Sequence, residues 1–137
     1  MGAKIHLFVF ILAFLKADVI ISAHDLPSKS REFLQSHFDA KIGLVQRDEK
    51  SYEVYLSDGT ELEFDSAGAW RQIEAKRKPL SYDILPTQIA AVLRSEFKNM
   101  TMRELERKIN HYKIKFHNGS EIIIDFNGTI LHKEFED

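Results

Sequence analysis

Apolar and polar residues alternate over two stretches of the chain, and each stretch ends in a turn signal. The apolar positions are Tyr52, Val54 and Leu56 in the first stretch and Tyr112, Ile114 and Phe116 in the second. This period of two predicts half-buried β-strands. Asp58-Gly59 and Asn118-Gly119 follow the stretches, and such pairs favour two-residue hairpins. Leu62 and Phe64 continue the first hairpin, and Ile122 and Ile124 continue the second.

A segment with helical spacing precedes each hairpin. Its apolar residues lie three, four or seven positions apart, which predicts a helix with one buried stripe. They are Leu26, Phe33, Leu34 and Phe38 before the first hairpin, and Leu85, Ile89, Val92, Leu93 and Phe97 before the second. Pro27 and Pro86 fit the first helical turn, where no backbone N–H is needed.

Shorter strands are predicted around the hairpins, near residues 41–48, 70–75, 103–109 and 130–135. Each half of the chain therefore reads as one helix followed by about four antiparallel strands. Helices on one face of such a sheet give a two-layer α+β fold. Trp70 stays unassigned, because Trp70 and Ile73 differ in strand parity and periodicity cannot place both on one face.

The two halves match each other residue by residue. Leu26-Pro27 and Phe38 recur as Leu85-Pro86 and Phe97 at an offset of 59, and the offset is 60 after one inserted residue. The residues matched at the offset of 60 are Tyr52 and Tyr112, Gly59 and Gly119, Asp65 and Asp125, and Gly68 and Gly128. We therefore predict two tandem repeats, over about 24–78 and 79–137, with residues 76–79 as linker.

Residues 1–23 are typical of a secretory signal peptide. Lys4 supplies a positive charge, residues 5–15 form an apolar run of eleven residues, and the small Ala23 is a plausible cleavage position. We predict export, with residues 24–137 as the mature domain and no membrane attachment after cleavage. The alternative is an uncleaved anchor.

Composition narrows the function classes. The chain has 137 residues, of which 44% are hydrophobic and 29% charged, so it is globular. Its net charge of −2 gives no basic field for nucleic acid. Without any Cys, it has no disulfides, thiolate zinc sites or Cys nucleophile.

The residues in the first half resemble a known family. The pattern consists of Leu26-Pro27, Tyr52-Glu53-Val54-Tyr55-Leu56, Asp58-Gly59, Phe64-Asp65, Gly68 and Trp70. It looks like the PepSY-like family of β-lactamase-inhibitor-like proteins, although the second half has Ile130 in place of Trp70. The resemblance implies a periplasmic protein of Bacteroidota-type bacteria and a continuous antiparallel sheet with helices on one side. It implies no catalytic residues.

No motif predicts catalysis or a cofactor. Asp65 and Asp125 precede turn glycines, where Asp commonly bonds backbone N–H groups. The six His residues are scattered, and His24 would join a metal site only as a new N-terminus with a second His nearby. Three N-x-[ST] sequons, and Asp65-Ser66-Ala67, which resembles the O-glycosylation motif of Bacteroidota, are weak modification signals. We therefore expect no enzyme.

The sheet face away from the helices is the candidate binding surface. Its predicted outward residues are Glu53, Tyr55, Glu61 and Glu63 in the first half and Lys113, Lys115, Glu121 and Ile123 in the second. One half is acidic with a Tyr, and the other is mostly basic with an Ile. We expect this face to bind a periplasmic protein or peptide, unless it is an ordinary solvated face. The alternative function is a carrier of a small ligand or metal, using a pocket between helices and sheet.

Overall fold

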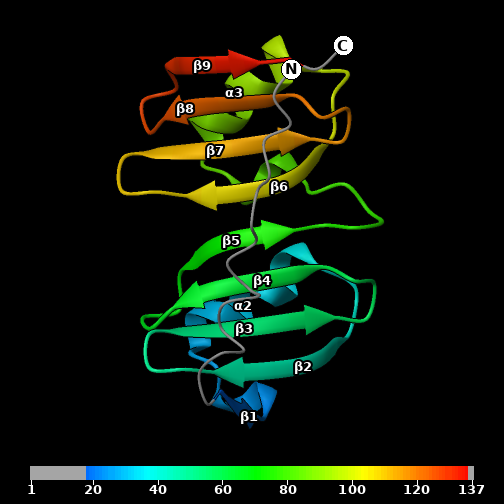
Figure 1. Ribbon diagram of the computed structural model, residues 1–137, viewed down its shortest axis with the longest axis vertical. Coiled ribbons are helices and arrows are strands. Elements are labelled where there is room, and N and C mark those ends of the chain that lie inside the picture. The colour runs from blue at the N-terminus through cyan, green and yellow to red at the C-terminus, as the bar shows by residue number, and fades with distance from the viewer. Residues whose placement is uncertain (1–17, 136–137) are drawn as a thin grey trace, which may run out of the picture.

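A single antiparallel sheet organises the protein. The computed structural model describes residues 18–135, and its nine strands lie side by side in chain order (Figure 1). The strands are β1 (Val19–Ile21), β2 (Ile42–Arg47), β3 (Ser51–Leu56), β4 (Glu61–Asp65), β5 (Trp70–Glu74), β6 (Met102–Arg107), β7 (His111–Phe116), β8 (Glu121–Asp125) and β9 (Ile130–Glu134). Each strand pairs antiparallel with the next, as the hairpin signals predict.

Both α-helices pack on the same face of this sheet (Figure 1). They are α2 (Ser28–His37) and α3 (Thr87–Glu96), and each follows a short 3-10 helix, η1 (Ala23–Asp25) or η2 (Tyr82–Ile84). Pro27 and Pro86 stand at the N-cap rather than inside the first turn, because their ψ values of 144° and 149° are extended. The two-layer α+β architecture is therefore confirmed, with this small change at the helix starts.

The two halves have the same order of elements. In each, a Ser side chain accepts the N–H two residues later and so caps the 3-10 helix: Ser22 for η1 and Ser81 for η2. A ten-residue helix and four strands follow. Aligning the capping serines gives an offset of 59 through the helices, and aligning the turn glycines gives 60 through the strands. Below, "corresponding positions" means positions paired in this way.

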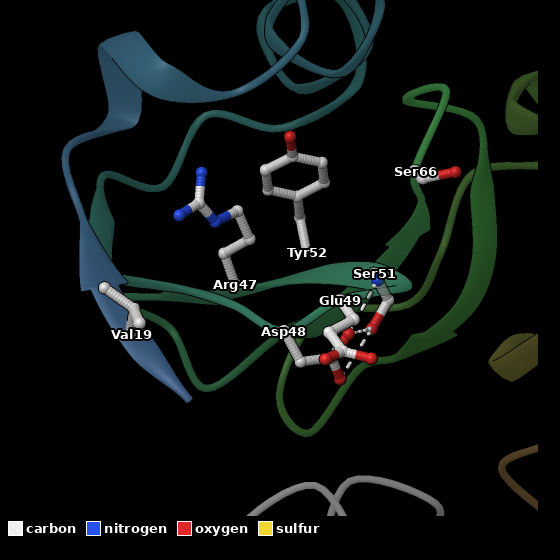
Figure 2. A pocket seen from close by; sticks show the side chains of 7 residues that line it. All are labelled: Val19, Arg47, Asp48, Glu49, Ser51, Tyr52 and Ser66. Atoms are coloured by element: carbon white, nitrogen blue, oxygen red, sulfur yellow. Dashed lines mark hydrogen bonds between the residues drawn. The ribbon is translucent and has the colours of Figure 1, made fainter. Parts of the chain in front are cut away.

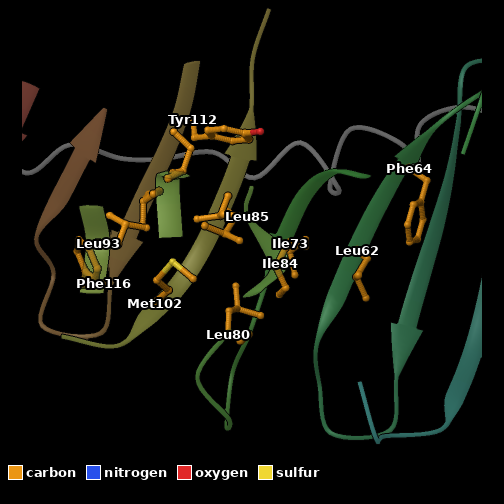
Figure 3. Packing of buried hydrophobic residues seen from close by; sticks show 14 of the residues in the cluster. Leu62, Phe64, Ile73, Leu80, Ile84, Leu85, Leu93, Met102, Tyr112 and Phe116 are labelled. Atoms are coloured by element: carbon orange, nitrogen blue, oxygen red, sulfur yellow. The ribbon is translucent and has the colours of Figure 1, made fainter. Parts of the chain in front are cut away.

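The hydrophobic core lies between the helices and the sheet and runs through both halves (Figure 3). Leu80, Ile84 and Leu85 pack between the β5 and β6 regions, so the core is continuous across the junction (Figure 3). The predicted core residues of both hairpins and helices are buried or packed on this cluster; Phe33, Phe38, Tyr52 and Val92 are half-buried.

A β-bulge decides the position of Trp70. Glu63 pairs with Gln72, but the next residue, Phe64, pairs with Trp70, so Arg71 is an extra residue in β5. An extra residue reverses the parity of a strand. Trp70 therefore lies on the helix side, where its ring stacks 6.4 Å from that of Phe33.

Strand β1 lies inside the segment that the sequence assigns to the signal peptide. It pairs with β2 through Val19–Arg47, Ile20–Gln46 and Ile21–Val45. Ile21 and Ala23 pack against the core. Most of the predicted signal, residues 1–17, lies outside the described residues. The sequence does not predict this strand, because residues 19–21 fall within the stretch that is typical of a signal peptide.

Candidate functional site

The strand register places the predicted outward residues together on the helix-free face. Glu53 is opposite Glu63, and Tyr55 is opposite Glu61. Lys113 is likewise opposite Ile123, and Lys115 is opposite Glu121. Their neighbours along each strand, such as Val54 and Ile114, are fully buried on the helix side. None of these residues lies beneath the helices.

The face is only partly accessible. Glu53 is 3% exposed and Glu121 is 7% exposed, whereas Tyr55, Lys113 and Ile123 are half-buried. Glu61, Glu63 and Lys115 are half-buried as well. The half-buried side chains are therefore the accessible part of this face, whereas Glu53 and Glu121 are almost fully covered by their neighbours.

Glutamates change the predicted charge of the second half. Lys113 lies 3.7 Å from Glu121, and Lys115 lies 4.0 Å from Glu104. Glu106 is also on this face, opposite Lys113. The lysines are therefore offset by carboxylates, and this half is mixed rather than mostly basic. The alternation of Glu104 and Glu106 in the predicted strand near residues 103–109 indicates that both carboxylates lie on one face. Periodicity alone does not say that this face is the helix-free one.

Two carboxyl groups on this face have strongly raised pKa values. Burial, together with the nearby negative charges of Asp18 and Glu63, raises the pKa of Glu53 to about 7, although the Tyr55 hydroxyl donates a hydrogen bond to Glu53 Oε2 at 3.0 Å. Burial, followed by the charges of Glu104 and Glu61, raises the pKa of Glu74 to about 7. Glu53 and Glu74, two members of an acidic band on β3–β6, therefore take up a proton near neutral pH.

The repeated aspartates are turn residues, as predicted. Asp65 Oδ1 accepts the N–H groups of Ala67 and Ala69, each at 3.0 Å. Asp125 Oδ1 accepts the equivalent N–H groups of Asn127 and Thr129. These bonds tie both carboxylates to their own turns.

Neither a metal site nor a membrane span is found in the part of the chain that the structure describes. Within residues 18–135, no group of three or more His, Asp or Glu side chains is arranged to hold a metal ion. Over the same residues, no helix is long and apolar enough to cross a membrane.

A polar hollow of about 410 Å³ lies at the β2–β3 turn (Figure 2). Asp48 Oδ1 accepts hydrogen bonds from the N–H and the hydroxyl of Ser51, at 2.8 and 3.1 Å. The Tyr52 side chain points away from these bonds, on the side of Arg47 (Figure 2). The groups do not converge on a common point, so the hollow offers no acid–base pair.

A second cleft, of about 360 Å³, lies between η1, α2 and the start of β2. Its walls are mainly apolar, with polar side chains among them. The lining residues are Ala23, His24, Arg31, Leu34, Gln35, Phe38, Ala40, Ile42 and Leu56. Small-molecule sites commonly combine apolar walls with few polar groups. A pocket between helices and sheet was expected from the sequence, but none of these lining residues could be predicted for it.

Comparison with known proteins identifies the family. A family model described as "Putative beta-lactamase-inhibitor-like, PepSY-like" matches residues 50–132, which is more than half of the chain. The chain belongs to this PepSY-like family. The resemblance drawn from the Leu-Pro, Tyr and turn-glycine pattern is thereby confirmed. A search of curated proteins found no match.

Two solved structures share the fold over most of this PepSY-like chain. A protein from Bacteroides vulgatus, named as a periplasmic protein of unknown function, is 30% identical, with a TM-score of 0.76 over 86% of this chain and 99% of that chain. A second protein from the same species, named as a periplasmic protein of the DUF2874 family, is 26% identical, with a TM-score of 0.79 over 86% of this chain and 97% of that chain. This PepSY-like chain is thus similar to proteins assigned to the periplasm.

Proposed function

We propose that this chain is an exported periplasmic binding protein without enzymatic activity, built from two copies of one helix-and-strand unit, whose helix-free sheet face binds a protein or peptide. The observation that carries the proposal is the position of both α-helices on one face of a nine-stranded sheet. Proteins recognise partners through such broad surfaces when a few apolar or aromatic anchors are present.

Tyr55 and Ile123 supply the anchors in this proposal. Both are half-buried on the helix-free face, one in each half of the sheet. The acidic band around Glu61 and Glu63 orients a partner by charge, which raises association rates more than affinity. Affinity then depends on Tyr55 and Ile123.

A double substitution tests this surface. Tyr55→Ser with Ile123→Ser is expected to leave folding intact and to reduce capture of the native partner from envelope extracts by at least tenfold. Ile109→Ser is the matched control, because Ile109 is 95% exposed at the β6–β7 turn, away from the strands of the face. Equal capture by the wild-type and the double variant would reject the binding face.

Export is part of the same proposal, and strand β1 bears on where the signal peptide ends. Cleavage after Ala23 would remove the β1–β2 pairing and the Ser22 cap of η1. We therefore place the cleavage before Val19, and Ala17 is a small residue directly before the described region. N-terminal sequencing of the envelope protein separates a start near Asp18 from a start at His24, and a start at Met1 would contradict cleavage altogether.

The cleft lined by Ala23 favours a second function, that of a small-ligand carrier. It has a closed apolar floor formed by Leu34 and Leu56, both 5% exposed. For a metal carrier, residues 18–135 contain no group of side chains arranged to hold a metal ion. Titration of the exported protein with small aromatic molecules tests the carrier function, and absence of any binding in the cleft would reject it.

A further inference from the structure

The cleft lined by Ala23 has a counterpart in the second half, and there it is filled by a side chain of the protein itself. Tyr82 follows the capping Ser81, as Ala23 follows the capping Ser22. The single proton of the Tyr82 hydroxyl is shared between two carbonyl oxygens, that of Met100 at 2.7 Å and that of Phe97 at 3.1 Å. The second half therefore contains a site that holds one phenol ring and binds its hydroxyl.

The rim of this filled site is closed by charged side chains. The Arg94 guanidinium lies 5.9 Å from the centre of the Tyr82 ring and forms an ion pair with Asp83. A guanidinium over an aromatic face is attractive. Arg94 thus lies over the ring, and its ion pair with Asp83 holds it at the rim.

The first half keeps the walls of this site and lacks its occupant. Leu34, Phe38, Ala40 and Leu56 line the cleft at the positions that correspond to Leu93, Phe97, Met100 and Phe116. His24 and Gln35 take the places of Asp83 and Arg94. These two positions of the first half therefore cannot form the ion pair that Arg94 and Asp83 form. The ring of Tyr82 is replaced by the single methyl group of Ala23.

One acceptor at the polar end of the site is retained. The carbonyl oxygen of Ala40, a lining residue of the cleft, corresponds to that of Met100, the nearer acceptor of the Tyr82 hydroxyl. The next positions also match, because the Lys41 carbonyl accepts the N–H of Ser57 as the Thr101 carbonyl accepts that of His117. The Phe38 carbonyl is turned differently from that of Phe97, since their ψ values are 134° and 37°. Among residues 18–135, no hydrogen bond to the Ala40 oxygen is found. A phenol hydroxyl is a suitable donor, because its ordinary pKa of about 10 keeps it protonated at neutral pH.

We propose that the cleft between η1, α2 and β2 binds a free para-substituted phenol, with the ring against Leu34 and Leu56 and the hydroxyl donating to the carbonyl of Ala40. The bound phenol takes the place that Tyr82 occupies in the second half. This inference rests on the carrier function proposed above and specifies its ligand chemistry. It is independent of the helix-free face.

Titration with p-cresol, the side-chain analogue of tyrosine, tests the proposal. Exported wild-type protein is expected to bind p-cresol at one site and to bind 4-methylanisole about tenfold more weakly, because only p-cresol can donate a hydrogen bond to the Ala40 carbonyl. N-acetyl-tyrosinamide distinguishes a free phenol from a tyrosine side chain within a peptide. Tighter binding of the amide than of p-cresol would overturn the assignment to a free small molecule.

Ala23→Tyr is the decisive variant, since it supplies the first half with its own phenol. It is expected to abolish p-cresol binding and to raise the melting temperature. Lys29→Tyr, at an exposed position of α2, adds the same residue outside the cleft and is expected to bind p-cresol as the wild-type does. Unchanged binding by Ala23→Tyr would overturn the proposal.

Tyr82→Ala provides the reciprocal test if Ala23→Tyr does not fold. It opens the second site and is expected to create a second p-cresol site in a less stable protein; a single site in this variant would overturn the proposal. Two failures are distinguishable. If 4-methylanisole and p-cresol bind equally and Ala23→Tyr blocks both, the phenol inference is wrong and the carrier function stands. If neither molecule binds in the cleft, both are wrong.

Discussion

Apart from the additional edge strand β1, the two halves of the sheet have the same elements, but their interiors are filled to different degrees. In the second half, the Tyr112 ring lies 6.0 Å from Trp70 and 4.9 Å from Phe126. At the corresponding place in the first half, Tyr52 borders an open hollow beside Ser66 (Figure 2). A small residue stands where an aromatic ring would close the site.

The same difference separates Ala23 from Tyr82. In both places the order of helix and strands is kept, and smaller side chains leave a hollow in the first half: Ala23, Ala40 and Leu56 stand where the second half has Tyr82, Met100 and Phe116. Close-packed interiors leave few such spaces. The first half therefore has room for a ligand, while the second half is closed by its own aromatic residues.

Truncation of the core is expected to have the largest effect and to test whether both halves are equally packed beneath the helices. Phe64 and Ile124 occupy corresponding positions, and both are 0% exposed. Phe64→Ala should reduce the free energy of unfolding by about 3–5 kcal/mol and Ile124→Ala by about 2–5 kcal/mol. Denaturant unfolding measures both, and a loss below about 0.5 kcal/mol, typical of surface sites, would contradict the strand assignment.

Two corresponding turn glycines, one in each half, differ in the space around them. Gly68 and Gly128 have φ values of +97° and +89°, which disfavour any residue with a Cβ. A Cβ at Gly68 would lie 2.8 Å from the Pro27 Cβ, whereas one at Gly128 would lie 3.5 Å from a methyl group of Val92. We expect Gly68→Ala to lose about 2–4 kcal/mol and Gly128→Ala about 1–2 kcal/mol. Equal losses in thermal unfolding would show that the turn conformation alone sets the cost.

The smallest expected effect is a pH dependence specific to the first half, where Glu53 corresponds to Lys113. Because burial raises the pKa of Glu53 to about 7, the folded state binds a proton more tightly than the unfolded chain. Its stabilising contribution is present below about pH 4.5 and is lost as the pH rises through 7. Glu53→Gln should stabilise the protein at pH 8 by on the order of 1 kcal/mol.

Measurement of unfolding at pH 5 and pH 8 checks this effect. Glu53→Gln should flatten the decrease in stability between the two pH values, whereas Lys113→Gln, at the corresponding position, should retain the wild-type slope. A wild-type protein that becomes more stable from pH 5 to pH 8, with Glu53→Gln unchanged, would rule out a raised pKa at Glu53.

Much of the fold follows from periodicity. The alternation around Tyr52 and Tyr112, the turn glycines and the spacing of Leu34 and Leu93 predict the hairpins and helices found in the structure. Trp70 could not be placed, because a single bulge residue, Arg71, reverses strand parity. Bulges depend on pairing between strands and leave no mark in the period of one strand.

Less of the candidate sites could be predicted from the sequence. Periodicity placed Tyr55 and Ile123 on the helix-free face, but the pairing of Lys115 with Glu104 depends on which strands become neighbours. The cleft at Ala23 can be recognised only by comparing Ala23 with Tyr82. The sequence alone gives no reason to compare an alanine with a tyrosine. The environment of Tyr82 provides that reason.

Chemical-shift mapping of the exported protein with p-cresol tests the difference between the halves most directly. The account predicts saturable shifts of the backbone amides of Ala40, Ile42 and Leu56, which surround the open cleft. The amides at the corresponding positions, Met100, Met102 and Phe116, should not move, because Tyr82 fills their site. Shifts of both groups, or shifts confined to the helix-free face, would contradict the account.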